Sequence, residues 1–385
     1  MFLDKTVERN PKLIEAAFKL HQQGIIEPDT YVIDMDTLSL NAESIKEQGD
    51  KYGIKLYFMT KQLGRNPYVA KKLMDIGYEG AVVVDFREAK TMIENHIKIG
   101  NVGHLVQIPK GSMKEIISSN PEYVTVYSLE KAQEVSRAAK ELGMNQKLML
   151  RVLDKEDCLY SGQYGGFYIE ELEEKAKSIE ALDNVTVKGI TSFPCFLYNE
   201  ETNEIEPMNN CNTLLKAKKI LEESDIYVEE VNMPSATCVD NIKKIYDMGG
   251  THGEPGHGLM GTTPYSKYND TKELPAMVYV SEISHNLDDH SYCYGGGHYR
   301  RSHVENALVG HSLKNSVKEK VTAPTLESID YHFNIEENHK VGETVVMSFR
   351  AQVFVTRSNV AVVEGISTGN LKLVGIYDAL GRKIK

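Results

Sequence analysis

Residues 55–66 read KLYFMTKQLGRN, an apolar, β-prone run that leads directly into Lys61 and then into a glycine-containing loop. The helical pattern NPYVAKKLMDIG follows at residues 66–77 and is closed by Gly77. The apolar run is short enough for a strand that is buried on both faces, and the helix after it would cover that strand. This stretch therefore predicts one strand–helix unit of a parallel sheet.

The same alternation of short apolar runs and amphipathic segments continues from residue 54 to about residue 261. The predicted strands lie at residues 54–60, 81–85, 102–108, 123–127, 147–153, 185–193, 228–233 and about 250–253. Eight strand–helix units in about 210 residues are typical of a (β/α)8 TIM barrel. A doubly wound open sheet has the same periodicity and stays an alternative.

Two other parts of the chain follow a different pattern. The run TYVIDMD at residues 30–36 would be a ninth strand, so we expect it to belong to another sheet. After Pro264, long alternating runs replace the strand–helix pattern, at residues 276–285, 345–356 and 359–368. We therefore predict a barrel over residues 37–264 and an all-β domain formed by residues 1–36 and 265–385.

The composition is that of an ordinary globular protein, with 41% hydrophobic and 26% charged residues. The formal charge of −11 argues against a nucleic-acid or anionic-membrane surface, because an acidic protein repels phosphate. The start MFLDKTVERN lacks a signal-peptide layout and no run has the length of a membrane span, so we expect a cytoplasmic protein. The five scattered cysteines indicate neither a disulfide framework nor a zinc site.

Polar residues follow the ends of several predicted barrel strands, where the loops of such a barrel form its mouth. They are Lys61, Arg151, Ser192, Asn232, Ser235 and Glu254. A partly desolvated lysine at such a mouth has a lowered pKa, which makes available the neutral amine that attacks carbonyls. A lysine that extends its stem to solvent is the alternative and, from position alone, the more frequent case.

The loops after the last two predicted strands, at residues 232–238 and 252–261, are rich in small residues. Small residues let backbone N–H groups approach a phosphate, although they also fill ordinary turns. Glu254 lies between Gly253 and Pro255 in the second of these loops. Its carboxylate would cap the surface or, opposite a lysine-bound heteroaromatic ring, hold a ring nitrogen protonated.

These segments resemble the fold-type III pyridoxal-phosphate enzymes, the group of alanine racemase, ornithine and diaminopimelate decarboxylases and D-threonine aldolase, and within it the YhfX-type branch. YVIDMDTLSLNA is similar to the opening strand and helix of that group, and FMTKQLG to the segment whose lysine binds the cofactor, which points to Lys61. LRVLD resembles a decarboxylase strand whose arginine lies beside the cofactor, which points to Arg151. EPGH resembles the decarboxylase EPGR, so the resemblance implies that Glu254 meets the pyridine nitrogen and that Gly256 and His257 contribute to the phosphate site.

The resemblance also implies residues in the second domain. SYCYGGGHY looks like the racemase segment that places a tyrosine across a dimer interface and like the decarboxylase segment that supplies a cysteine, which points to Tyr294 and Cys293. A glycine-rich hairpin with incidental aromatic residues is the alternative. GIYDALG contains Tyr377, which resembles a tyrosine that reaches the cofactor phosphate.

Several positions depart from the family pattern. Arg65 replaces the racemase tyrosine four residues after the lysine and would lie near the phosphate or the substrate carboxylate. Ser192 or Phe193 stands where a histidine usually stacks on the cofactor, and Ser235 and Thr237 would replace a glycine triplet at the phosphate. Racemases of the group usually have arginine in place of the glutamate. An ionisable carboxylate there favours fuller delocalisation of a carbanion, which suits decarboxylation and aldol-type cleavage as well as racemisation.

The resemblance thus predicts a pyridoxal 5'-phosphate enzyme that acts at the α-carbon of an amino acid as a homodimer with shared active sites. Lys61 and Tyr294 of a partner subunit would be two opposed bases, which favours a racemase. A decarboxylase or a D-threonine aldolase-like lyase is the first alternative, and a non-catalytic cofactor-binding protein is the second. The histidines and acids at residues 284–303 lack the spacing of a metal motif, so no metal site is predicted.

Overall fold

The computed structural model describes residues 2–385. This part of the chain divides into two compact units. The first contains the residues up to Ser44, Lys61–Val69 and His257–Lys385, and the second contains Ile45–Thr60 and Ala70–Gly256. The chain therefore passes from one unit to the other four times, and the expected domain boundaries at residues 37 and 264 stay a prediction.

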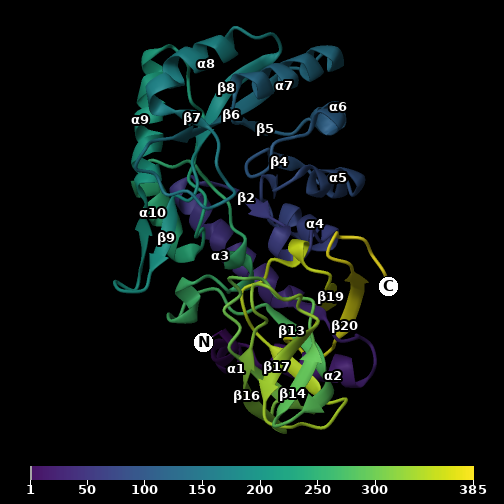
Figure 1. The fold of residues 1–385 in the computed structure, drawn as a ribbon. Helices are drawn as coiled ribbons and strands as arrows, with labels where there is room; N and C mark the ends of the chain where they lie inside the picture. Colours follow the sequence, from purple (N-terminus) through teal and green to yellow (C-terminus); the bar gives the residue numbers. More distant parts are fainter. Residues whose placement is uncertain (1) are drawn as a thin grey trace. The chain divides into compact units, whose positions relative to one another are not determined.

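The second unit contains, among the described residues, a closed ring of eight parallel strands. Figure 1 labels several of these strands and the helices that belong to the same unit. They are β2 (Lys55–Met59), β3 (Gly80–Val83), β4 (Ile99–Val102), β5 (Tyr123–Val126), β6 (Gln146–Leu153), β8 (Val185–Thr191), β11 (Glu230–Asn232) and β12 (His252–Gly253). Each pairs with the next, and β12 pairs with β2 to close the ring. The predicted (β/α)8 barrel is confirmed, and the open sheet is excluded.

One helix precedes the first barrel strand, and the other helices around the ring each follow a barrel strand in the expected order. They are α3 (Met35–Tyr52), α4 (Pro67–Ile76), α5 (Phe86–Glu94), α6 (Met113–Ser118), α7 (Leu129–Leu142), α8 (Leu172–Glu180), α9 (Asn209–Glu223) and α10 (Val239–Asp247). Helix α7 has a capped start, because the Ser128 side chain accepts a hydrogen bond from the N–H of Lys131. It ends at Gly143, whose φ of +66° is left-handed. The short strand β7 (Phe167–Tyr168) and the hairpin β9 (Phe196–Asn199) to β10 (Glu204–Pro207) are additions to this pattern.

One predicted barrel strand was misplaced. The expected run at residues 102–108 lies mostly outside the strand, since β4 ends at Val102. Gly103 follows with a φ of +92°, and a Cβ there would lie 2.4 Å from the carbonyl oxygen of Thr125. The chain turns away from the sheet at this glycine, so His104 lies in a loop.

The first unit contains an antiparallel ring of strands within the described part of the chain. They are β13 (Met277–Leu287), β14 (His290–Tyr294), β17 (His332–Glu336), β16 (Ser316–Thr322), β15 (Asn306–Gly310) and β18 (Thr344–Met347). Strand β13 pairs with both β14 and β18, which closes the ring. The first residues of β13 also pair with β1 (Thr30–Asp34), which pairs in parallel with β19 (Asn359–Glu364), and β19 pairs with β20 (Lys372–Tyr377). The ninth strand thus belongs to another sheet, as its position in the sequence predicts.

Two expectations for this unit were wrong. The alternating run at residues 345–356 is not one strand, because β18 ends at Met347 and a short 3-10 helix, η6, covers Val353–Val355. The residues before β1 were expected to be part of an all-β domain, but they are largely helical and form α1 (Phe2–Arg9) and α2 (Pro11–Gln22). Asn10 caps α2 and Pro11 begins it. The apolar face of α2 belongs to the same hydrophobic core as Val278 and Val280 of β13.

Candidate functional site

Three polar side chains from neighbouring barrel strands form a hydrogen-bonded row in the barrel unit. Asn232, at the end of β11, donates through Nδ2 to Glu254 Oε1 over 2.7 Å and to Thr191 Oγ1 over 3.1 Å. The backbone N–H of Glu254 in turn donates to Thr237 Oγ1 over 3.1 Å. All four side chains are buried. The carboxylate is therefore held in one orientation at the carboxyl ends of the strands.

Two buried histidines lie beside this carboxylate. His104 Nε2 is 3.8 Å from Glu254 Oε2, and His252 Nε2 is 3.8 Å from Oε1. Burial and the charge of Lys55 lower the pKa of His252 to about 3, so its ring is neutral and the second contact is no ion pair. The His252 ring stacks on Tyr57 with the centroids 4.1 Å apart. The ring of His104 meets that of Phe193 edge to face at 5.7 Å.

Arg151 lies in β6 and is wholly buried. Its two terminal nitrogens donate to the Tyr127 hydroxyl oxygen over 2.8 Å and to the carbonyl oxygen of Gln163 over 2.7 Å. Burial raises the pKa of Tyr127 although the Arg151 charge opposes the shift, and the protonated hydroxyl donates to the carbonyl oxygen of His104. Arg151 Nε has no hydrogen-bond partner within residues 2–385. A buried guanidinium with only neutral acceptors has capacity for an anionic or electron-rich oxygen.

The serine and threonine predicted for the phosphate site have their hydroxyl groups engaged within the barrel unit. Ser235 and Ala236 have φ values of +89° and +52°, and the Ser235 hydroxyl donates to the carbonyl oxygen of Phe196 over 2.8 Å. The Ser192 hydroxyl oxygen accepts a hydrogen bond from Asn210 Nδ2 over 2.9 Å. Phosphate contacts in this region would therefore come first from backbone N–H groups, and the phosphate roles of Ser235 and Thr237 stay predictions.

Lys61 is the residue directly after Thr60 and begins the 3-10 helix η1 (Lys61–Leu63). The Thr60 hydroxyl donates to the buried carboxylate of Glu88, and the other carboxylate oxygen accepts the N–H of Val84 over 2.6 Å. These contacts hold the end of β2 in place. Lys61 itself is half-buried and belongs to the first compact unit.

Other predicted residues of the first unit are Arg65 and His257. Arg65 is buried with a left-handed φ of +55°, and its guanidinium lies 5.7 Å from the centroid of the Phe354 ring. His257 has its ring nitrogens 3.4 Å from Thr262 Oγ1 and 3.3 Å from Gln352 Nε2.

The environment of His257 keeps its ring neutral. Burial lowers its pKa well below the ordinary value, and the positive charges of Arg350, Lys61 and Arg301 lower it further. His257 thus supplies a neutral hydrogen-bonding group. The positive charge around it comes from the lysine and the two arginines.

Cys293 and Tyr294 point to opposite sides of β14. The thiol of Cys293 is wholly buried, and burial raises its pKa to about 12. Tyr294 is 39% exposed, with its ring 6.0 Å from that of His332. The tyrosine is therefore the one of the two that solvent or another molecule can reach. Tyr377 is buried at the end of β20, and burial raises its pKa.

Sequence reasoning missed three polar residues of the barrel unit, namely His104, Tyr127 and Asn210. His104 fell inside a strand that was predicted too long, whereas Gly103 signals the true strand end. Tyr127 directly follows β5, so the strand-end rule would have found it. Asn210 lies on α9, and nothing in its local pattern indicates that it binds Ser192.

No cluster of three or more His, Cys, Asp and Glu side chains within residues 2–385 is arranged to bind a metal ion. None of the described helices combines the length and the apolar character that a membrane crossing requires.

The chain matches two protein-family models and resembles known proteins along its whole length. The model of the alanine racemase N-terminal domain matches residues 33–264, and that of the YhfX-like C-terminal domain matches residues 278–373. The YhfX protein of Escherichia coli (strain K12), described as uncharacterised, is 42% identical over 389 residues, which cover 100% of both chains.

Solved structures share the fold at low sequence identity. An alanine racemase from Clostridium difficile 630 in complex with cycloserine has a TM-score of 0.64 and 19% identity, with 91% of this chain and 98% of that chain covered. A diaminopimelate decarboxylase from M. jannaschi has a TM-score of 0.66 and 15% identity, with coverages of 95% and 93%. The chain therefore belongs to the alanine racemase N-terminal domain family, which binds pyridoxal 5'-phosphate, and carries a YhfX-like C-terminal domain.

Proposed function

We propose that this protein is a pyridoxal-phosphate-dependent amino-acid racemase that works as a homodimer in the cytoplasm. The observation that carries the proposal is the arrangement of β14, where Tyr294 is exposed and Cys293 is buried. A racemase needs an acid or base on each side of the α-carbon, and the exposed tyrosine is the group available for the second side. We assign Lys61 as the acid or base on the first side of the α-carbon.

The residues at the carboxyl ends of the barrel strands fit the cofactor. Arg151 has a buried Nε without a partner among the described residues, and its hydrogen bonds go to neutral oxygens. A phenolic or phosphate oxygen suits this guanidinium. The Glu254 carboxylate, which Asn232 holds, suits a ring nitrogen that carries a proton. Backbone N–H groups near Ser235 and Gly256 would hold the phosphate.

The side chains of this protein would have separate tasks. Lys61 would hold the cofactor through Nζ and would move a proton at the α-carbon of the substrate on one face. Tyr294 of the partner subunit would move a proton on the opposite face through its hydroxyl oxygen. When bound, pyridoxal phosphate withdraws electrons from the α-carbon. Glu254 would strengthen this withdrawal because it keeps the ring nitrogen protonated.

A decarboxylase is the second candidate function, and the Glu254–Asn232 hydrogen bond favours it. A carboxylate at the ring nitrogen gives strong electron withdrawal, which the loss of carbon dioxide requires. A D-threonine aldolase-like lyase would use the Glu254 carboxylate in the same way. A non-catalytic cofactor-binding protein would need no second acid or base, so the exposed Tyr294 argues against it.

A panel of D- and L-amino acids in deuterated water tests these functions. A racemase exchanges the α-proton for deuterium and mixes the two enantiomers. Released carbon dioxide would replace the proposal with the decarboxylase, and an aldehyde product would replace it with the lyase. Bound cofactor without any turnover would contradict an enzymatic function.

The lysine assignment is tested separately by spectroscopy. The Lys61→Ala variant should lose the visible absorbance of a lysine-bound cofactor. Lys55→Ala is a suitable control, because Lys55 is half-exposed and its partner is Glu230. A wild-type spectrum in the Lys61 variant would refute the assignment.

A further inference from the structure

The glycine run that follows Tyr294 is bonded along its backbone. The N–H of Gly295 donates to the carbonyl oxygen of Tyr331 over 2.8 Å. The N–H groups of Gly296 and His298 both donate to Asp330 Oδ2, over 3.1 and 3.0 Å. A run of three glycines is flexible unless its polar groups are engaged. Asp330 therefore restricts the backbone flexibility that three consecutive glycines would otherwise have.

A serine and a tyrosine of the same unit bind carbonyl groups of the segment. The Ser281 hydroxyl donates to the carbonyl oxygen of Tyr294 over 2.7 Å, and the Tyr31 hydroxyl donates to that of Gly297 over 2.6 Å. A Cβ at Gly297 would lie 2.4 Å from the ring of Tyr279. The glycine is required because an aromatic ring packs directly against the backbone.

Gly296 is equally confined. Its φ is +132°, and a Cβ there would lie 1.9 Å from Asp29 Oδ2. Asp29 Oδ1 accepts hydrogen bonds from the hydroxyls of Tyr279, over 2.8 Å, and Ser358. The side of Gly296 that a side chain would occupy is thus taken by a fixed carboxyl group.

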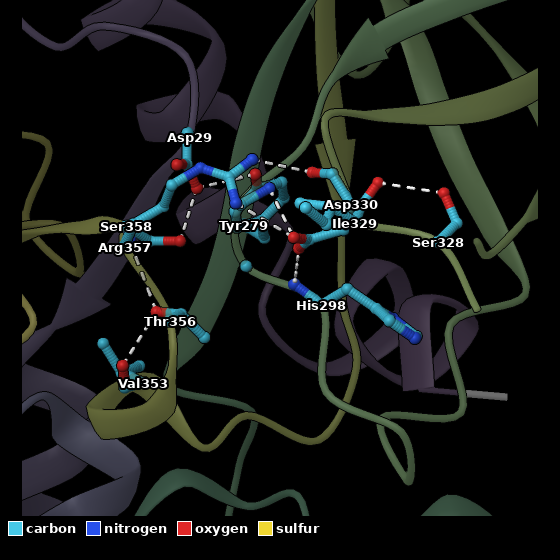
Figure 2. A network of polar contacts seen from close by, with 12 residues as sticks. Asp29, Tyr279, His298, Ser328, Ile329, Asp330, Val353, Thr356, Arg357 and Ser358 are labelled. Carbon is cyan, nitrogen blue, oxygen red and sulfur yellow. Dashed lines mark hydrogen bonds and ion pairs between the residues drawn. The ribbon is translucent and has the colours of Figure 1, made fainter. Parts of the chain in front are cut away.

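Arg357 binds the Asp330 end of this network (Figure 2). Its guanidinium donates to Asp330 Oδ1 over 3.0 Å and to the Asp330 carbonyl oxygen over 2.8 Å. The Arg357 backbone N–H donates to the carbonyl oxygen of Gly296 over 3.4 Å. Arg357 is half-exposed, so the ion pair alone contributes little. The hydrogen bonds from the backbone N–H groups of Gly296 and His298 to the Asp330 carboxylate are charge-assisted and are the stronger part of the arrangement.

We propose that Asp330, oriented by Arg357, is a positioning residue that fixes the direction of Tyr294 by binding the two N–H groups of Gly296 and His298. The proposal rests on the proposed function of Tyr294 as the second acid or base. A displaced tyrosine hydroxyl would transfer protons slowly, because catalysis falls steeply when a reacting group moves by about 1 Å.

The position of Tyr294 can be measured without any activity. The chain contains no tryptophan, so Tyr294→Trp introduces a single tryptophan, whose fluorescence can be excited selectively over that of the tyrosines. In the Tyr294→Trp background, Asp330→Ala should increase the fast local component of the fluorescence anisotropy decay. Glu336→Ala is the matched control, because Glu336 lies on β17 and pairs with Lys320 at 3.0 Å, away from the glycine run. Equal decays for Asp330→Ala and Glu336→Ala would overturn the proposal.

The kinetic readout uses proteins that keep Tyr294. Asp330→Ala should lower racemisation by about 10- to 100-fold. The exchange of the α-proton of one enantiomer, which needs only the Lys61 face, should stay within about twofold of wild type. Asp330→Asn keeps one acceptor oxygen and should recover part of the racemisation rate. An equal loss of racemisation, exchange and thermal stability would show a merely structural role and overturn the proposal.

The two proposals fail in different ways. If the wild-type protein racemises no amino acid, the proposed function fails while the anisotropy comparison still decides the role of Asp330. If Asp330→Ala does not fold, Asp330→Asn and Arg357→Gln carry the same comparison, since each removes one part of the arrangement. If both of these variants keep the anisotropy decay of the parent Tyr294→Trp protein, the positioning role of Asp330 is rejected.

Discussion

Asn232 Nδ2 lies 2.7 Å from Glu254 Oε1, and both side chains are buried at the carboxyl ends of adjacent barrel strands. A hydrogen bond to a carboxylate stabilises its charged form. The orientation of the Glu254 carboxylate thus depends on a residue 22 positions earlier in the chain.

Asn232→Ala should therefore weaken the protein's interaction with a protonated cofactor ring. A lost hydrogen bond to a buried charged group costs about 1.5–3 kcal/mol, or about 10- to 150-fold in the dissociation constant of pyridoxal phosphate. Absorbance titration measures this constant. Asn145→Ala is the control, since Asn145 is exposed and also donates to a threonine, Thr186. Equal affinities in the two variants would contradict the role of Asn232.

His252 should make the protein less stable in acid. Its pKa is about 3 in the folded protein and 6.5 in the unfolded chain, so below pH 6.5 the unfolded state binds more protons. Between pH 7 and pH 5 this group should lower the free energy of unfolding by about 2 kcal/mol. His252→Phe keeps a ring against Tyr57 and removes that loss, which urea unfolding at the two pH values would detect. If the free energy of unfolding of the variant depends on pH as it does in the wild type, the low pKa of His252 is contradicted.

Asp29 should have the opposite effect. Burial raises its pKa from 3.8 to about 6, so the folded state binds more protons than the unfolded state between these values. Its contribution to stability is present at low pH and is lost as the pH rises through about 6, by at most about 3 kcal/mol. Asp29→Asn should therefore be more stable relative to wild type at pH 7 than at pH 4. Thermal unfolding of both proteins at the two pH values is the measurement. The same stability difference between variant and wild type at both pH values would refute the raised pKa of Asp29.

Gly100 should not tolerate a side chain. A Cβ there would lie 2.0 Å from Tyr57 Cδ1, and the Tyr57 ring is buried and stacked on His252. Gly100→Ala should destabilise the protein by about 1–3 kcal/mol, as overpacked cores do. Gly111→Ala, with no atom within 4 Å of the new carbon, should change stability by less than about 0.5 kcal/mol. Equal unfolding midpoints in urea would contradict this packing argument.

Local periodicity predicts most of the barrel. Strands such as β2 and helices such as α7 have their own apolar period and caps, and Ser128 and Gly143 mark the ends of α7 without any tertiary information. The misplaced strand at residues 102–108 shows the limit. Its apolar residues continue past Gly103, and only the backbone turn at that glycine ends β4.

The candidate site was predictable where its residues follow parallel strands. Asn232 ends one strand and Glu254 follows the neighbouring one, and both strands end at one edge of the ring, so their contact could be expected from topology. The contact between Asn210 and Ser192 depends on where α9 packs, which the local pattern does not contain. The choice between Cys293 and Tyr294 depends on which side of β14 faces the core. The roles proposed for Arg65, Tyr377 and the other site residues stay predictions.

Strand β1 pairs with β13 through residues such as Thr30 and Val280, which are about 250 positions apart. On a ribosome that adds about 5–20 residues per second, this buried apolar strand would wait roughly 12–50 s for its first neighbour. Its two open edges would meanwhile be exposed to other nascent chains. A fragment that stops after the barrel would keep that exposure permanently, so shortened forms of this protein should depend on chaperones or precipitate.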